Sequence, residues 1–208
     1  MNLVSGRGSR AGAELALNPK VAMISFTGST AVGVSLSQQA LKTVKRISLE
    51  LGGKSPCVWL PDLPDYRPAV KPLFNSIFLN SGQTCTALSR LIVPKARLAE
   101  VEKLLQDHVK DYPVGDPFDP KVLIGPMASR QQFETVKSYI ELGVKEGARL
   151  LAGSIPEEPG AHEKGWFIQP TIFTDVKNDM RIAREEIFGP VLCVIAYDTV
   201  NEAVAIAN

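Results

Sequence analysis

Apolar residues recur every three or four positions in two segments of the second half of the chain, which predicts two helices that each bury one face. The first helix is marked by Leu98, Val101, Leu104, Leu105 and Val109. The second is marked by Phe133, Val136, Ile140 and Val144. Ser129 is placed to cap this second helix and Gly147 to end it. Both stripes are interpreted as core faces.

Short apolar runs separate the helical segments and predict strands. The expected strands cover 2–4, 21–26, 46–51, 55–60, 89–94, 148–152, 167–173 and 191–197. Further helices are expected over 10–17, 31–41, 69–80 and 200–207, the last with Thr199 and Glu202 as a capping box. Because strands alternate with helices, we expect an α/β fold whose largely parallel sheet is flanked by helices on both faces.

Composition narrows the class of protein. Hydrophobic residues make up 45% of the chain and charged residues 22%, which is enough apolar material for a core. The net charge of +1 gives no reason to expect nucleic acid as a partner. No run approaches the roughly 20 apolar residues of a membrane span, and the first residues lack the features of a signal peptide. We therefore expect a cytoplasmic protein with no membrane partner.

Cysteine and glutamate supply the candidate chemistry. Cys85 and Glu50 each lie in glycine-rich sequence, which leaves room for a substrate to approach the backbone. A thiol beside a base can carry out covalent acyl chemistry, and a position at the start of the next helix would favour the thiolate. The alternative is a small buried cysteine and a solvated glutamate. Cys57 and Cys193 lie in apolar runs and are expected in the core, and no metal site is predicted.

A turn after the second predicted strand is a candidate anion site. Residues 24–33 read as an apolar strand, a glycine at position 28 and a helix that Ser29 or Thr30 can cap. The free N–H groups of a helix start suit a pyrophosphate, although an ordinary capped turn explains the same residues. The glycine-rich run 6–12 does not have the spacing of a dinucleotide fingerprint, and it is interpreted as a turn and a helix start.

Four motifs in a fixed order give these segments a common interpretation. They are FTGST at 26–30, LELGGK at 49–54, GQTC at 82–85 and EEIFGP at 185–190, with weaker matches at 124–127 and 169–172. Together they resemble the aldehyde dehydrogenase superfamily over nearly the whole chain. The resemblance implies oxidation of a small-molecule aldehyde to a carboxylic acid with NAD or NADP.

The resemblance also implies roles for single residues. Cys85 is expected to be the nucleophile that forms a thiohemiacetal and then a thioester, and its backbone N–H to donate to the substrate oxygen. Glu50 is expected to be the base that activates water. The expected cofactor contacts are Gly28, Ser29, Val32 and Gly33 at the pyrophosphate, Glu186 at the nicotinamide ribose, Phe188 beside the nicotinamide ring, and Gly52 at the hinge.

Residues 1–49 are too few for the two mononucleotide-binding halves of a complete cofactor domain. We therefore expect residues 1–52 to be the C-terminal remnant of that domain and residues 53–208 to be a catalytic domain truncated at its C-terminus. Cofactor binding is expected to be weak or absent, and uncovered faces to favour a homo-oligomer. Two alternatives stay open: a redox-free cysteine esterase, and a catalytically silent fragment that acts only in assembly.

Overall fold

The computed structural model describes residues 2–157 and 165–208. The chain divides into two compact units, Met1–Gly52 and Gly53–Asn208. Residues 154–165 are rich in proline and glycine, and we expect them to form a surface loop, but they fall mostly outside the described residues.

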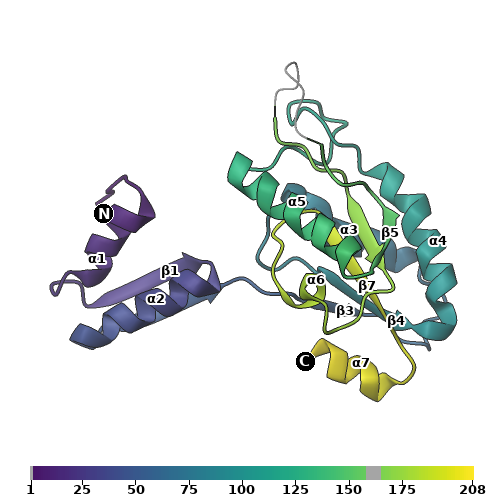
Figure 1. Cartoon of the computed structure of the whole chain (residues 1–208), viewed down its shortest axis with the longest axis horizontal. Coiled ribbons are helices and arrows are strands. Elements are labelled where there is room, and N and C mark those ends of the chain that lie inside the picture. The colour runs from purple at the N-terminus through teal and green to yellow at the C-terminus, as the bar shows by residue number, and fades with distance from the viewer. Residues whose placement is uncertain (1, 158–164) are drawn as a thin grey trace. The chain divides into compact units, whose positions relative to one another are not determined.

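The smaller unit is a pair of parallel strands with short helices (Figure 1). Its elements are a π-helical turn (Gly8–Gly12), α1 (Ala13–Leu17), β1 (Met23–Gly28), α2 (Thr30–Ala40), a 3-10 turn (Leu41–Thr43) and β2 (Arg46–Leu51). The two strands are in register, with Thr27 opposite Glu50. The strand expected over 2–4 is wrong, since these residues form no strand. The cap is confirmed, because Ser29 Oγ accepts a hydrogen bond from the backbone N–H of Val32 at 3.4 Å.

The larger unit is built on a five-stranded sheet in the order β3-β4-β7-β6-β5. Its strands are β3 (Pro56–Val58), β4 (Arg90–Pro94), β5 (Arg149–Ala152), β6 (Thr171–Thr174) and β7 (Val191–Tyr197). All neighbouring strands are parallel except β5 and β6. The predicted α/β fold with a largely parallel, helix-flanked sheet is confirmed.

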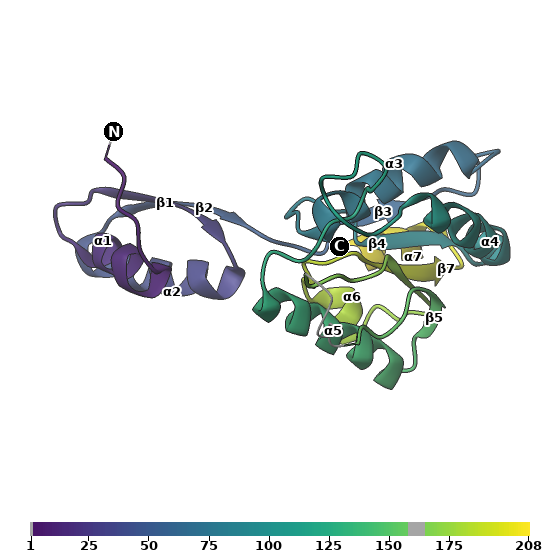
Figure 2. The ribbon, with the colours of Figure 1, turned by 90° about the horizontal axis from the view of Figure 1, so that it is seen from above.

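Helices cover both faces of this sheet (Figure 2). They are α3 (Arg67–Phe78), α4 (Leu98–His108), α5 (Arg130–Lys145), α6 (Arg181–Arg184) and α7 (Val200–Ala207). The helices α3 and α4 pack on one face, and α5 and α6 pack on the other. Both expected caps are present, because Ser129 accepts from the Gln132 N–H and Thr199 accepts from the Glu202 N–H.

The central strand β7 contributes to both cores because successive side chains of a strand point to opposite faces. Leu192 and Val194 join the cluster under α3 and α4. Val191, Cys193 and Ile195 join the cluster under α5 and α6. A strand buried on both faces reads as a continuous apolar run, which is why its bounds were predicted correctly.

One expected core position is wrong. Val144 on α5 is 46% exposed, whereas Gly143 faces the core. A Cβ atom at Gly143 would lie 2.8 Å from the ring of Phe173, so a glycine is what lets α5 approach the sheet closely. The helical stripe predicted from apolar residues alone overlooked this position, because glycine carries no hydrophobic signal.

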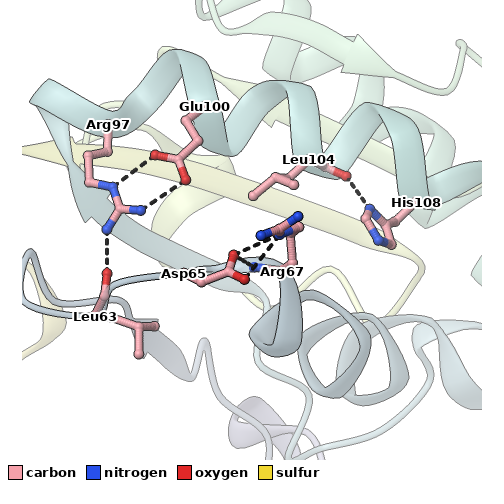
Figure 3. Close-up of polar contacts among 7 residues, drawn as sticks. All are labelled: Leu63, Asp65, Arg67, Arg97, Glu100, Leu104 and His108. Atoms are coloured by element: carbon pink, nitrogen blue, oxygen red, sulfur yellow. Dashed lines mark hydrogen bonds and ion pairs between the residues drawn. The ribbon is translucent and has the colours of Figure 1, made fainter.

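Arg97 fixes the loop between β3 and α3 against the start of α4 (Figure 3). Its guanidinium donates two 2.9 Å hydrogen bonds to the Glu100 carboxylate and one of 2.5 Å to the Leu63 carbonyl. The same group lies 3.7 Å from the ring centroid of the buried Tyr66, a cation–π contact. These contacts of Arg97 hold the loop before α3 against the start of α4. We assign this cluster a structural role.

Candidate active site

Cys85 lies on an exposed turn between α3 and β4. The turn is closed by a 3.1 Å hydrogen bond from the Ala87 N–H to the Thr84 carbonyl. The expectation that Cys85 opens a helix is wrong, because β4 begins at Arg90 and too few residues intervene to form one. The helix dipole therefore does not act on this thiol. Within the described part of the chain, the Cys85 backbone N–H has no hydrogen-bond partner, so it can donate to a substrate oxygen.

The segment before Cys85 is folded into an unusual backbone. Asn80, Ser81 and Gly82 all have left-handed conformations, with φ of 53°, 57° and 71°. Two side chains close this loop: Asn80 Nδ2 donates to the Gln83 carbonyl at 2.9 Å, and Gln83 Nε2 donates to the Asn80 carbonyl at 3.2 Å. Residues in this region of φ and ψ persist where surrounding contacts hold them.

Contacts distant in sequence supply that support. Ser81 Oγ donates to the Gly125 carbonyl at 2.8 Å, and Gln83 Oε1 accepts from the Ala128 N–H at 2.9 Å. Both residues therefore brace the turn that carries Cys85. Sequence reasoning assigned neither of them a role, although Gln83 lies inside the GQTC motif.

Gly82 brings this loop onto the segment that contains Glu186 and Phe188. A Cβ atom at Gly82 would lie 2.2 Å from the Gly189 carbonyl carbon, so only glycine fits this contact. Gln132 on α5 holds the other side of the segment, since its Nε2 donates to the carbonyls of Ile187 at 3.1 Å and Phe188 at 2.8 Å. The cysteine turn and the predicted cofactor contacts are therefore neighbours.

A small cavity lies at this junction, and residues from both segments line it. Thr84 comes from the cysteine turn, Glu186 and Phe188 come from the segment after α6, and Lys54 lies at the start of the unit. Glu186 is half-buried, and burial raises the pKa of its carboxyl, while a hydrogen bond from the Gly53 backbone lowers it. Phe188 is 38% exposed and has φ of 55°.

Comparisons with known proteins identify the family of this chain. The model of the aldehyde dehydrogenase family matches residues 1–208. The chain belongs to the aldehyde dehydrogenase family. It is 50% identical over 207 residues to 3-succinoylsemialdehyde-pyridine dehydrogenase of a Pseudomonas species, covering 100% of this chain and 43% of that protein. The chain thus spans less than half the length of that curated relative.

Solved structures of aldehyde dehydrogenases share the fold. A cysteine-to-alanine mutant of aldehyde dehydrogenase C from Pseudomonas syringae, in complex with NAD+ and octanal, is 49% identical with a TM-score of 0.93, covering 99% of this chain and 42% of that chain. The Mycobacterium tuberculosis aldehyde dehydrogenase complexed with NAD+ is 44% identical with a TM-score of 0.89, covering 95% and 40%.

The predicted base and pyrophosphate contacts of this chain lie in the smaller unit. Glu50 is exposed on β2, and Ser29 and Val32 lie at the start of α2. Gly33 is buried, and a Cβ atom there would lie 2.8 Å from the side chain of Leu51. Gly33 thus packs α2 on β2, and its contact with a cofactor stays a prediction.

An open groove of about 640 Å³ lies within the same unit between α1, β1 and α2. Val32 lines it, as do Gly8, Ser9 and Gly12 from the run that was interpreted as a turn and a helix start. The resemblance also implies that Glu50 and Cys85 converge on one cleft, and this stays a prediction because the two residues belong to different units.

We also searched the described residues for a metal site, for a histidine that could act in catalysis and for a membrane-spanning helix. No group of three or more potential metal ligands occurs among them. His108 Nδ1 lies 2.8 Å from the Leu104 carbonyl, which accounts for one nitrogen of its ring (Figure 3). Among the described helices, none has the length and apolar character needed to span a membrane.

Proposed function

We propose that this chain supplies the nucleophile, the base and part of the cofactor contacts of an enzyme that oxidises an aldehyde to a carboxylic acid with NAD or NADP. One observation carries the proposal: Cys85 is exposed on a turn that Gly82 and Gln83 brace beside Glu186 and Phe188. The Pseudomonas syringae relative, crystallised with NAD+ and octanal, supports the substrate class.

The first chemical step takes place at Cys85. Its sulfur adds to the aldehyde carbon, the carbonyl π electrons move onto oxygen, and the thiol proton passes by way of a base to that oxygen, which becomes the hydroxyl of a thiohemiacetal. The backbone N–H of Cys85 donates to this oxygen as negative charge develops on it. Removal of one such donor typically costs about 2.7–4 kcal/mol of transition-state stabilisation. Loss of a hydride from carbon and a proton from oxygen then leaves a thioester on Cys85.

Glu50 completes the cycle. Its carboxylate takes a proton from the water that attacks the thioester carbon. The carbon–sulfur bond breaks, the carboxylic acid is released, and the sulfur regains a proton. A carboxylate in this role contributes about 10²–10⁴-fold to the rate of such a step.

The residues present fit part of a nicotinamide dinucleotide. The N–H groups at the start of α2, which Ser29 caps, suit a pyrophosphate, and Gly28 immediately precedes them. Glu186 can accept hydrogen bonds from the nicotinamide ribose, and Phe188, which is 38% exposed, can contact the nicotinamide ring. When bound, NAD or NADP accepts the hydride ion that leaves the substrate carbon.

Cofactor binding by this chain is expected to be weak. A dinucleotide site uses two mononucleotide-binding halves, whereas the smaller unit has two strands. Calorimetric titration with NAD should therefore give no micromolar dissociation constant. A micromolar constant would contradict this expectation. Homo-oligomerisation through exposed apolar faces also stays a prediction.

Hydrolysis of an activated phenyl ester tests the role of Cys85 without a cofactor. We expect Cys85→Ser to abolish turnover, and Glu50→Gln to slow release of the acyl group while leaving its formation. Cys57→Ser is the matched control, because Cys57 is half-buried and burial raises the pKa of its thiol. Equal turnover by wild type and Cys85→Ser would overturn the proposal.

Addition of an aldehyde with NAD separates the alternatives. Formation of NADH that depends on Cys85 supports full oxidation. Ester turnover without NADH supports a redox-free cysteine esterase. One observation favours this alternative: Cys85 and the contacts that hold its turn all lie within Gly53–Asn208. Absence of both signals supports a fragment that is silent in catalysis.

A further inference from the structure

The side-chain nitrogen of Lys54, the last residue of the LELGGK motif, is buried and has no partner among the described residues. The backbone carbonyl of Lys54, by contrast, accepts a 2.8 Å hydrogen bond from Arg90 Nε. Burial of an unpaired ammonium is unfavourable, so a lysine in this place calls for a compensating role.

Lys54 lines the cavity at the cysteine turn. The same cavity is lined by Gly82 and Thr84 from that turn and by Glu186 and Phe188 from the opposite segment. Lys54 therefore lines the wall shared by the predicted nucleophile loop and the predicted ribose contact, and it also lines a groove together with Arg90, Asp179 and Arg184. This placement distinguishes Lys54 from exposed lysines of the unit.

Three groups act electrostatically on the Lys54 ammonium. Burial lowers the pKa of Lys54, Cys193 and Glu186 raise it, and Arg90 lowers it. The Cys193 thiol donates to the Ile182 carbonyl at 3.2 Å, and burial raises its own pKa, so at neutral pH this group is uncharged. Glu186 is therefore the anionic group among these three.

Glu186 depends on the lysine in return. Burial raises the pKa of its carboxyl, whereas the Gly53 backbone N–H and the Lys54 ammonium lower it. An ionised carboxylate can accept hydrogen bonds from both hydroxyls of a ribose, but a protonated carboxyl donates one and accepts fewer. Loss of the Lys54 ammonium would thus change the number of hydrogen bonds that Glu186 can accept from a ribose.

We propose that Lys54 is a positioning residue that acts through Glu186: its buried, unpaired ammonium shares a cavity wall with this carboxylate and holds it in place beside Phe188. The proposal rests on the role given above to Glu186 as the ribose contact. It assigns Lys54 to cofactor recognition without direct contact to the cofactor.

The titration of Glu186 tests this coupling. Side-chain carboxyl resonances are followed by ¹³C NMR against pH, with Glu186→Gln used to assign the signal. Lys54→Met is expected to move the Glu186 midpoint to higher pH, and Lys54→Arg to leave it near the wild-type value. The exposed Lys71 on α3 provides the matched control as Lys71→Met. An unchanged midpoint in folded Lys54→Met would overturn the proposal.

A reciprocal measurement covers the case in which Lys54→Met does not fold. By linkage, removal of the Glu186 charge must lower the titration midpoint of Lys54, which ¹⁵N-labelled lysine reports in wild type and Glu186→Gln. An equal Lys54 midpoint in both proteins would overturn the coupling. Binding of nicotinamide mononucleotide to Glu186→Gln tests the ribose contact separately. Undiminished binding there would overturn the ribose role of Glu186 while the measured coupling stands.

Discussion

The two units of this chain differ in how much of their apolar surface they bury. In the larger unit Phe133, Ile140 and Phe173 are fully buried in one cluster of apolar side chains, and a second large cluster lies on the other face of the sheet. In the described part of the smaller unit the buried hydrophobic residues are Ala16 and Ala40 alone. Two open grooves, of about 400 and 640 Å³, run along the helices and strands of the smaller unit.

This difference between the two units shows that a segment can form regular helices and strands and still bury too little apolar surface to be stable on its own. The smaller unit has a capped helix and two registered strands, as its sequence predicts. A two-stranded sheet is at best marginally stable in water, because most of the stability of a helix or strand comes from packing. We therefore expect Gly53–Asn208 to hold its structure far more firmly than Met1–Gly52.

Cysteine labelling should give the largest difference. Cys193 is fully buried in the larger unit, so it reacts only when that unit opens, whereas Cys85 is exposed. We expect iodoacetamide to modify Cys193 at least about a thousandfold more slowly than Cys85, since core opening costs several kcal/mol. Mass spectrometry of digested samples measures both rates.

A cysteine placed at Ala40 is the matched probe of the smaller unit, because Ala40 is only 1% exposed. Ala40→Cys should label nearly as fast as Cys85 if that unit opens readily. If the new cysteine is labelled as slowly as Cys193, the smaller unit is as stable as the larger one, which would contradict the expected difference. Labelling of Cys193 and Cys85 at one rate would count against an ordered larger unit and against Cys85 as a distinct nucleophile.

Truncation of one phenylalanine in each unit should give a smaller difference. Phe173→Ala removes a fully buried ring and should cost about 3–5 kcal/mol of unfolding free energy. Phe26→Ala in the smaller unit removes a half-buried ring and should leave the larger unit unaffected. Trp59 and Trp166 both lie in the larger unit, so their fluorescence in urea reports its unfolding alone. An equal loss in both variants would show that the units unfold together.

The smallest effect concerns a charged contact on α6. Glu185 accepts hydrogen bonds from Arg181, at 2.7 Å and 2.9 Å, and from the Tyr139 hydroxyl at 2.7 Å. Arg181 and then Tyr139 lower the pKa of Glu185 to about 2, and burial followed by Glu185 raises that of Tyr139 to about 12.

Because the folded pKa of Glu185 lies below its unfolded value of about 4.3, its contribution is full above that pH and is lost as pH falls toward 2. The melting temperature of wild type should therefore exceed that of Glu185→Gln at pH 6, and the gap should close near pH 2. The gap is expected to be small because Glu185 is 38% exposed. A gap that stays constant with pH would contradict the assignment.

Local signals accounted for much of the fold. Ser29, Ser129 and Thr199 cap the helices that follow them, and β7 has the predicted bounds. Each of these features depends on residues within a few positions of one another. The expected strand over 2–4 failed, because a strand requires a partner that its own residues cannot specify.

The candidate site was predicted less completely. The motifs identified Cys85 and Glu186, but not the contacts that hold them. Gln132 contacts carbonyls 55 and 56 positions away, and Ser81 contacts one 44 positions away. No local pattern reports such pairs, and the same holds for the buried Lys54.

The sequence by itself determined the family, the alternation of strands and helices, and the residues with reactive side chains. The tertiary structure decided that Cys85 lies on an exposed turn instead of a helix start, and that Gly82 packs on Gly189. It also decided that the Nζ atom of Lys54 is buried and that Lys54 and Glu186 line the same cavity. The physical reason is range: caps and periodicity act between near neighbours, whereas close packing and burial depend on segments that folding brings together from distant positions.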